Sequence, residues 1–241
     1  MTAATTTAAI AAAAADTAEA FMLGRLLLVP DLSGALFLPE ERVLIVADLH
    51  LEKGSAFASR GVLLPPYDTA ATLALLARAV ARYDPARIVA LGDSFHDLGG
   101  QERLAPAALA ALRALQAGRD WLWLTGNHDP AIAAGLGGQV LGELDIAGVA
   151  LRHEPSAAPE GPEIAGHLHP AARIRLRGRS LRRRCFALSP RRCVMPAMGA
   201  YAGGLNVRDA AFQRLFGAEI STRILGDSRL FRINRSLLLP D

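Results

Sequence analysis

Five short motifs along the chain carry aspartate, asparagine and histidine, whose side chains bind divalent cations. In chain order they are Asp48-Leu49-His50, Gly92-Asp93, Gly126-Asn127-His128-Asp129, the single His153, and Gly166-His167-Leu168-His169. Five of the six histidines lie in these motifs, and the sixth, His96, follows Asp93 by three residues. A pair of borderline-hard cations would need this combination of imidazole, carboxylate and amide ligands, and such pairs catalyse the hydrolysis of phosphate esters.

The spacing within the motifs assigns different tasks to their side chains. Asp48 and His50 are two residues apart, so at a strand end both side chains point the same way and can reach one cation. The carboxylate of Asp93 has two oxygens and can bridge two cations ~3.5–4 Å apart. His167 and His169 can point to the same side and divide between the two cations. Each motif alone is common, but the five in this order are difficult to explain by structural needs.

The residues around the motifs predict the elements that position them. A continuous apolar run at 43–47 predicts a buried strand, and mostly apolar segments at 87–91 and 121–125 predict two more. Each of the three ends at one of the first three motifs. Helices predicted over 67–83 and 105–117 complete a βαβ pattern, in which ligand sites gather at the carboxyl ends of the strands. A second, largely antiparallel sheet is predicted from strands over 140–144, 149–153, 163–166, 173–177, 183–188 and 192–195.

Length and composition favour one large α/β domain over residues 21–241. The chain has 241 residues, of which 51% are hydrophobic and 20% charged, so wholesale disorder is not expected. Residues 1–20 are rich in alanine and threonine and are predicted to be a disordered extension without a secretory signal. The apolar run 8–15 is too short to span a membrane. Cys185 and Cys193 form no disulfide or zinc pattern, so we expect a reduced, cytoplasmic protein.

The order of these motifs resembles that of the calcineurin-like metallophosphoesterases. The resemblance spans Asp48 to His169. Four longer segments are similar to the bacterial PdeM subfamily, whose members are described as phosphoesterases or endonucleases associated with a DNA-ligase and helicase repair cluster. These segments are Ala47-Asp48-Leu49-His50-Leu51-Glu52-Lys53-Gly54, Leu64-Pro65-Pro66-Tyr67-Asp68-Thr69, Leu91-Gly92-Asp93-Ser94-Phe95-His96-Asp97 and Pro196-Ala197-Met198-Gly199-Ala200.

This resemblance implies a fold, a set of ligands and a catalytic residue. The fold would be a four-layer α/β/β/α metallophosphoesterase sandwich of two mixed sheets flanked by helices. Two divalent cations would be bound, usually manganese, otherwise iron, zinc or magnesium. His128 would not bind metal but would face the scissile phosphate. The ligands of the first cation would be Asp48, His50, Asp93 and His169, and those of the second Asp93, Asn127, His153 and His167.

One position departs from the family pattern. Many members have an aspartate three residues after that of the Gly-Asp motif, paired with the histidine of Gly-Asn-His. Here His96 holds that position and Asp97 follows, so either residue is a candidate to support His128. His96 and Asp97 are also candidates to contact substrate, with simple packing as the alternative for His96. Lys53 is a further candidate for a substrate phosphate contact, and an exposed lysine near a helix start is the alternative.

Residues 171–192 contain nine arginines and no acidic residue. On one strand, Arg173, Arg175, Arg177 and Arg179 would share a face that begins beside the metal site, the first two as candidate substrate contacts. Such a face attracts a nucleic-acid backbone. A solvated strand face or an oligomer contact explains the same pattern equally well. The nearby aromatic residue is Phe186 alone, so base stacking is not supported.

The leading hypothesis from these residues is a metal-dependent phosphodiesterase, a nuclease acting in DNA repair. A hydroxide bridging the two cations would attack phosphorus, and protonated His128 would stabilise the growing charge or protonate the leaving group. The alternative is a phosphomonoesterase or nucleotide pyrophosphohydrolase acting on a small substrate. A non-catalytic scaffold of the same fold would be expected to lose metal ligands, and none is lost here. DNA and ligase or helicase repair proteins are the expected partners, no membrane is involved, and the oligomeric state stays open.

Overall fold

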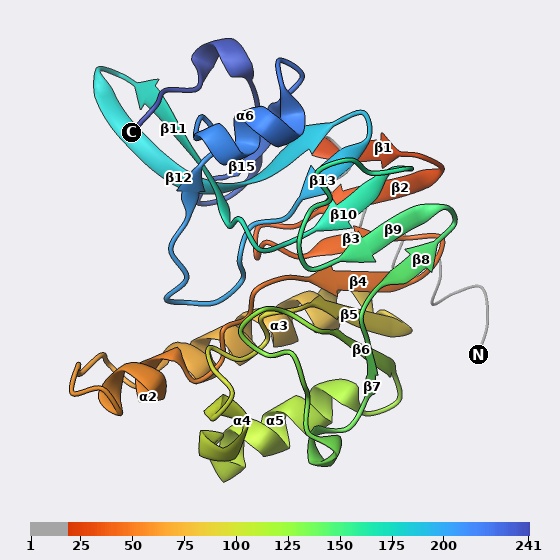
Figure 1. Ribbon diagram of the computed structural model, residues 1–241, viewed down its shortest axis with the longest axis vertical. Coiled ribbons are helices and arrows are strands. Elements are labelled where there is room, and N and C mark those ends of the chain that lie inside the picture. Colours follow the sequence, from red (N-terminus) through yellow and green to blue (C-terminus); the bar gives the residue numbers. More distant parts are fainter. Residues whose placement is uncertain (1–18) are drawn as a thin grey trace.

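Two β-sheets pack face to face at the centre of the molecule, and helices cover their outer faces (Figure 1). This computed structural model describes residues 19–241. The expected extension, residues 1–20, lies outside the described residues except for Glu19 and Ala20. The carboxylate of Glu19 lies 2.9 Å from Nε of Arg223, and Ala20 packs against the core, so both residues contact the folded domain.

The strands of the first sheet follow each other in chain order. The first four form an antiparallel meander, and β4 to β7 are all parallel. They are β1 (Phe21–Leu23), β2 (Leu26–Pro30), β3 (Leu36–Leu38), β4 (Val43–Val46), β5 (Arg87–Leu91), β6 (Asp120–Leu124) and β7 (Gln139–Leu141). The connections between the parallel strands hold α2 (Lys53–Ala58), α3 (Asp68–Tyr83), α4 (Gly100–Arg103), α5 (Pro106–Gln116) and the 3-10 helix η2 (Ala134–Leu136).

The second sheet contains nine strands and is mixed. Its order is β14-β11-β12-β13-β10-β9-β8, with β15 paired to β12 and β16 to β15. The strands are β8 (Leu144–Ile146), β9 (Val149–Arg152), β10 (Glu163–Ala165), β11 (Pro170–Leu176), β12 (Arg179–Ser189), β13 (Arg192–Val194), β14 (Leu205–Asn206), β15 (Ser221–Leu225) and β16 (Leu230–Asn234). The helix α6 (Ala210–Phe216) and the 3-10 helix η3 (Arg235–Leu237) complete this half.

Three apolar clusters hold the layers together. Side chains such as Ile45 and Phe186 form the core between the two sheets. Leu76 of α3 and Leu112 of α5 pack on the outer face of the first sheet. Phe212 of α6 covers the outer face of the second sheet. The predicted architecture of two mixed sheets flanked by helices is therefore confirmed, with a thin fourth layer.

Two sequence predictions of strands are wrong. The segment 140–144 was expected to be one strand, but β7 ends at Leu141 and β8 begins at Leu144 in the other sheet. Arg173, Arg175, Arg177 and Arg179 do not share one face. The chain reverses at Arg177 and Gly178, where φ is 49° and 77°, so Arg179 lies on the returning strand.

Two further observations concern membrane segments and cysteines. Within residues 19–241, every helix is too short or too polar to cross a lipid bilayer. Cys185 on β12 and Cys193 on β13 are both free and buried. Burial raises the pKa of both thiols, so neither is an activated nucleophile.

Candidate metal centre

Strands of both sheets deliver the candidate ligands to one edge of the molecule. In the first sheet, the segment Asp48-Leu49-His50 follows β4, Asp93 follows β5, and Asn127 lies beyond the end of β6. These strands are parallel neighbours, so their carboxyl ends lie side by side. In the second sheet, His153 follows β9 and His167 follows β10, which are also parallel neighbours. The mixed character of the second sheet therefore brings its two ligand motifs together.

The first ligand group consists of Asp48, His50 and His169. Their ligand atoms all lie within 4.8 Å of one another. Nε2 of His169 lies 3.4 Å from Oδ1 of Asp48 and 3.2 Å from Nε2 of His50. Asp48 and His50 are buried, so water competes little for these atoms.

The second ligand group consists of Asp93, His153 and His167, whose ligand atoms also lie within 4.8 Å of one another. Nε2 of His153 is 3.2 Å from Nδ1 of His167 and 3.4 Å from Oδ1 of Asp93. Oδ1 of Asn127 lies 2.9 Å from the same His153 nitrogen, so this amide oxygen joins the group.

Asp93 lies between the two groups. Its Oδ1 faces His153 of the second group, at 3.4 Å, and its Oδ2 is 4.0 Å from Nε2 of His50 in the first. The side chain is buried, and Oδ1 also accepts a hydrogen bond from the backbone N–H of His128. One carboxylate with an oxygen toward each group is the arrangement that a bridging ligand of two cations requires.

The backbone at five candidate ligands adopts left-handed angles. Ten non-glycine residues in the described part of the chain have positive φ, and these five make up half of them. Such conformations cost about 1–3 kcal/mol each and persist where the surrounding structure fixes them, as it does at functional sites. The five residues, with their φ angles, are Asp48 (53°), His50 (42°), Asp93 (47°), His167 (69°) and His169 (45°).

The donor atoms fit divalent cations. In each group two imidazole nitrogens face each other at 3.2 Å, so a cation near both could use both lone pairs. Nδ1 of His153 donates to the backbone carbonyl of Leu91 at 2.8 Å, which leaves Nε2 without a proton in the neutral ring. The residues present therefore suit one cation at the first group and one at the second, with Asp93 shared.

The carboxylates control the protonation of His153 while no cation is bound. Burial alone would lower the pKa of His153, but its hydrogen bond to the carboxylate of Asp93 and the charges of Asp48 and Asp93 raise this pKa to about 9. Burial alone would raise the pKa of Asp93, but the hydrogen bond and charge of His153 lower it to about 2. The two carboxylates therefore favour a proton on His153, and this proton competes with a cation for the ring.

We expect binding of Mn²⁺ to release this proton, because only the neutral imidazole of His153 binds metal. Below the raised pKa of about 9, the apparent affinity for Mn²⁺ should rise with pH, by up to roughly tenfold per pH unit for one proton. Isothermal titration calorimetry in two buffers of different ionisation enthalpy measures the number of protons released. Binding without proton release at neutral pH would contradict the assignment of His153 as a ligand.

His128 lies at the rim of this centre. Its side chain is 39% exposed, and its Nε2 lies 3.9 Å from Oδ2 of Asp93. Its Nδ1 donates to the backbone carbonyl of His96 at 2.7 Å, which fixes the direction of the ring. The carboxylate of Asp97 instead forms an ion pair with Arg103 at 2.5 Å. Of the two residues considered for support of His128, His96 therefore supplies it, through its backbone rather than its side chain.

The imidazole of His96 also lies at the centre. Its ring centroid is 5.6 Å from that of His50 and 5.4 Å from that of His128. Burial and then the charge of Lys53 lower the pKa of His96. Nζ of Lys53 lies 5.9 Å from the ring centroid of Phe57, which is 5.7 Å from that of His96. The structure thus gathers these two candidate substrate contacts beside the ligands.

Comparisons with known proteins agree with this geometry. A profile of the calcineurin-like phosphoesterase family matches residues 41–171, more than half of the chain. This chain belongs to that family. It is therefore a metal-dependent hydrolase of phosphoesters.

Two solved structures resemble this phosphoesterase. The nuclease MPE of Pseudomonas putida is 30% identical, with a TM-score of 0.69 over 89% of this chain and 99% of that chain. Yfce, a phosphoesterase from E. coli, is 14% identical, with a TM-score of 0.36 over 82% of this chain and 96% of that chain. A search among curated protein sequences gives no match.

Asp129 has a structural task in this phosphoesterase that the sequence did not reveal. Its buried carboxylate accepts hydrogen bonds from the backbone N–H groups of Asp93, Ser94 and Phe95, at 2.7–3.1 Å, and from that of Gly126 at 3.2 Å. Burial raises the pKa of Asp129 to about 6, although the N–H donors oppose this shift. The residue therefore joins the loop that carries Asp93 to the loop that carries Asn127 and His128.

Replacing Asp129 by asparagine should weaken the connection between these two loops. The amide has one acceptor oxygen, so N–H groups that now bond to the other oxygen lose their partner, at a cost of about 1–3 kcal/mol. We expect a lower melting temperature and weaker metal binding, in the range of roughly 10- to 100-fold that the loss of a supporting residue produces. Thermal unfolding with and without Mn²⁺ measures both effects. An unchanged metal affinity would show that the two loops keep their positions without this carboxylate.

Two glycines allow the ligand loops to approach each other. Gly92 has φ of +75°, and a Cβ there would lie 2.7 Å from the ring of His153. A Cβ at Gly126 would collide with the backbone nitrogen of Asp93. The glycines of the Gly-Asp and Gly-Asn-His-Asp motifs are thus explained by close packing around the ligands.

Arg173 and Arg175 make no contact with the ligand groups in the part of the chain that the structure describes. Nε of Arg173 donates to the hydroxyl of Ser180 at 2.6 Å, and its Nη1 donates to the carbonyl of Pro240 at 3.2 Å. Arg175 is exposed further along β11. The structure therefore places both outside the metal centre.

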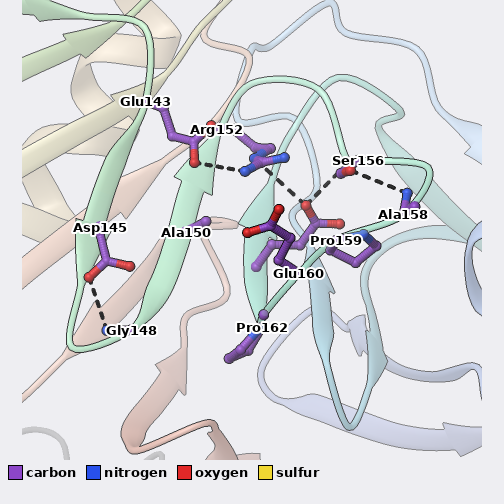
Figure 2. Close-up of a pocket in the computed structure, with 12 residues that line it drawn as sticks. Glu143, Asp145, Gly148, Ala150, Arg152, Ser156, Ala158, Pro159, Glu160 and Pro162 are labelled. Carbon is purple, nitrogen blue, oxygen red and sulfur yellow. Dashed lines mark hydrogen bonds and ion pairs between the residues drawn. The ribbon is translucent and has the colours of Figure 1, made fainter.

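A separate cavity of about 420 Å³ lies at the edge of the second sheet, beside β8 and β9. Figure 2 shows Arg152 pointing toward Glu143, to which it donates at 2.7 Å. The lining also includes Asp145, Glu160 and Glu163, and the last of these is paired with Arg152 and Arg192. None of the candidate metal ligands lines this cavity. Arg152 thus pairs with both Glu143 and Glu163, and Asp145 accepts a hydrogen bond from the backbone N–H of Gly148.

Proposed function

We propose that this phosphoesterase is a two-metal phosphodiesterase that cleaves nucleic acid. The position of Asp93 between two ligand groups carries the proposal, because each group contains enough donors for its own cation. Two divalent cations, with manganese as the first choice, would lower the pKa of water and neutralise charge on the phosphoryl oxygens. The similarity to a nuclease over 99% of that chain supports a nucleic-acid substrate.

The protein's own side chains would complete the reaction. His128 presents Nε2 at the rim while the carbonyl of His96 holds its Nδ1 proton. A protonated His128 would donate from Nε2 to the leaving oxygen or to the phosphoryl oxygens. Lys53, at the start of α2, adds positive charge near the same rim, which would help to orient a phosphodiester.

The biological setting is part of the same proposal. The segment Leu91–Asp97 and the other segments similar to the PdeM subfamily support a role in DNA repair beside ligase and helicase proteins, in the cytoplasm. Co-purification of the tagged chain with a DNA ligase and a helicase from its own cells would test this setting. If neither protein were recovered, these partners would lose their support, but the proposed hydrolysis of phosphodiesters would not be affected.

The experiment for the activity compares three substrates with Mn²⁺ present. They are bis(p-nitrophenyl) phosphate, p-nitrophenyl phosphate and a labelled oligonucleotide. We expect hydrolysis of the diester and the oligonucleotide, and much slower hydrolysis of the monoester. A preference for the monoester would overturn the proposal in favour of a phosphatase that acts on a small substrate.

A further inference from the structure

The strands β11 and β12 extend beyond the second sheet as a two-stranded arm. At its base, Pro170 and Ala171 pair with β14, and the end of β12 pairs with β13 and β15. Beyond the base the two strands pair with each other. Within residues 19–241, their one other backbone pairing there is the isolated bridge between Arg173 and Leu239. Figure 1 shows this arm at the upper left, away from the rest of the sheet.

The arm, defined as residues 173–183, carries positive charge that acidic residues compensate only in part. It contains no acidic residue and six arginines, which are Arg173, Arg175, Arg177, Arg179, Arg182 and Arg183. Arg182 lies 3.4 Å from Asp241, and Arg183 lies 3.5 Å from Asp227. In the described part of the chain, the side chains of the other exposed arginines, at 175, 177 and 179, form no hydrogen bond or ion pair. Three free guanidinium groups near the tip of a projecting arm attract a polyanion.

The arm starts at the metal centre. His169, a candidate ligand of the first cation, directly precedes β11, and the turn at Arg177 is eight residues further along. An extended strand of this length reaches roughly 26 Å. At 3.4 Å per nucleotide along one strand of a duplex, this reach equals on the order of eight nucleotides. Figure 1 shows that the arm and α2 project from the same side of the molecule.

We propose that this arm binds the sugar-phosphate backbone of a nucleic acid whose scissile phosphate lies in the metal centre. The proposal rests on the proposed nuclease function. Arginine binds phosphate through two parallel hydrogen bonds, and the arm offers no aromatic residue for base stacking. The contact therefore depends on backbone charge and not on sequence. It makes the enzyme prefer polynucleotides that reach the tip over short ones and over small diesters.

The test compares two triple variants that remove the same charge. The arm variant is R175Q/R177Q/R179Q, and the control R25Q/R78Q/R232Q removes three exposed arginines from the β1–β2 turn, α3 and β16. Both sets of side chains are exposed, so both variants should keep the melting temperature of the parent. Oligonucleotides of about four and about twenty nucleotides, shorter and longer than the span to the arm tip, serve as substrates.

We expect the arm variant alone to raise KM for the long oligonucleotide, by about tenfold, with little change in kcat. Its KM for the short oligonucleotide and its turnover of bis(p-nitrophenyl) phosphate should equal those of the control. In a plot of log affinity against log salt concentration, the slope for the arm variant should be shallower by about two, because three contacts to a single strand are lost. Equal behaviour of the two variants on the long substrate would overturn the proposal.

Binding measured without turnover separates this proposal from the proposed function. Fluorescence anisotropy of the long oligonucleotide in the absence of metal should show weaker binding by the arm variant than by the control. That difference would support nucleic-acid binding by the arm even if the protein hydrolysed no phosphodiester. In that case only the proposed nuclease function would be wrong. Polyglutamate of similar charge should compete poorly. Equal competition would assign the arm to acidic proteins and overturn the nucleic-acid proposal.

Discussion

Replacing Asp93 by alanine should abolish the binding of both cations and nearly all hydrolysis of phosphodiesters. Its two carboxylate oxygens face different ligand groups, so one substitution removes a ligand from each cation. Loss of a residue that merely supports a ligand costs roughly 10- to 100-fold, and loss of a shared ligand should cost more. Metal content by mass spectrometry, beside the rate of diester hydrolysis with Mn²⁺, measures both effects.

Asp120→Ala provides a matched control for this substitution. Asp120 lies at the amino end of β6, away from the ligands, and forms an exposed ion pair with Arg87 at 3.1 Å. Such a surface pair contributes little to stability, so this variant should keep both cations and its turnover. Asp93→Ala with intact turnover would contradict the assignment of Asp93 as the shared ligand. The loss of a single cation would restrict it to one ligand group.

The positions of the candidate ligands could be predicted because they follow a simple rule. A buried strand produces a continuous apolar run, and the polar residue after the run lies at the carboxyl edge of the sheet. Asp48 directly follows the run 43–47, Asp93 follows the run 87–91 after the single residue Gly92, and His153 follows β9. The rule needs no knowledge of loops, so the strand ends of the first sheet could be placed at one edge. The structure then shows that His153 and His169 of the second sheet meet this edge beside Asp93 and Asp48.

Contacts to the backbone could not be predicted in the same way. The partner of the His128 ring is the carbonyl of His96, and the partners of Asp129 are backbone N–H groups. Every residue has such groups, so residue types carry no signal for them. The aspartate expected beside the Gly-Asn-His histidine has its nearest counterpart in Asp97, yet Arg103 binds that carboxylate. Residue order alone therefore did not decide between His96 and Asp97.

The turns between strands were a second feature that could not be predicted from the sequence. The alternating arginines from Arg173 to Arg179 fit one long strand, but the chain reverses at Arg177 and Gly178. Gly178 was the available signal, since glycine readily adopts the positive φ that a hairpin turn requires. The change of sheet between Leu141 and Leu144 likewise depends on long-range packing and not on the local apolar pattern.

Replacing His128 by asparagine should slow the cleavage of an oligonucleotide by roughly 10²- to 10⁴-fold, the range for loss of a general acid or base. The leaving alkoxide of a nucleotide needs a proton, whereas the nitrophenolate of bis(p-nitrophenyl) phosphate is stable without one. The loss should therefore be smaller for the nitrophenyl diester. Metal content should stay unchanged, because we assign the cations to the groups that contain Asp48 and Asp93 and not to the third group, in which His128 lies with His50 and His96.

The loss of activity on the oligonucleotide, divided by the loss on the nitrophenyl diester, distinguishes between two roles of His128. An equal loss on both substrates would mean that the imidazole stabilises phosphoryl charge, since that charge develops with either leaving group. A loss confined to the oligonucleotide would assign proton donation from Nε2, the nitrogen left at the rim when Nδ1 bonds to the carbonyl of His96. A loss of metal would contradict both tasks and would assign His128 as a metal ligand beside His50 and His96, since ring nitrogens of these three histidines lie within 4.8 Å of one another.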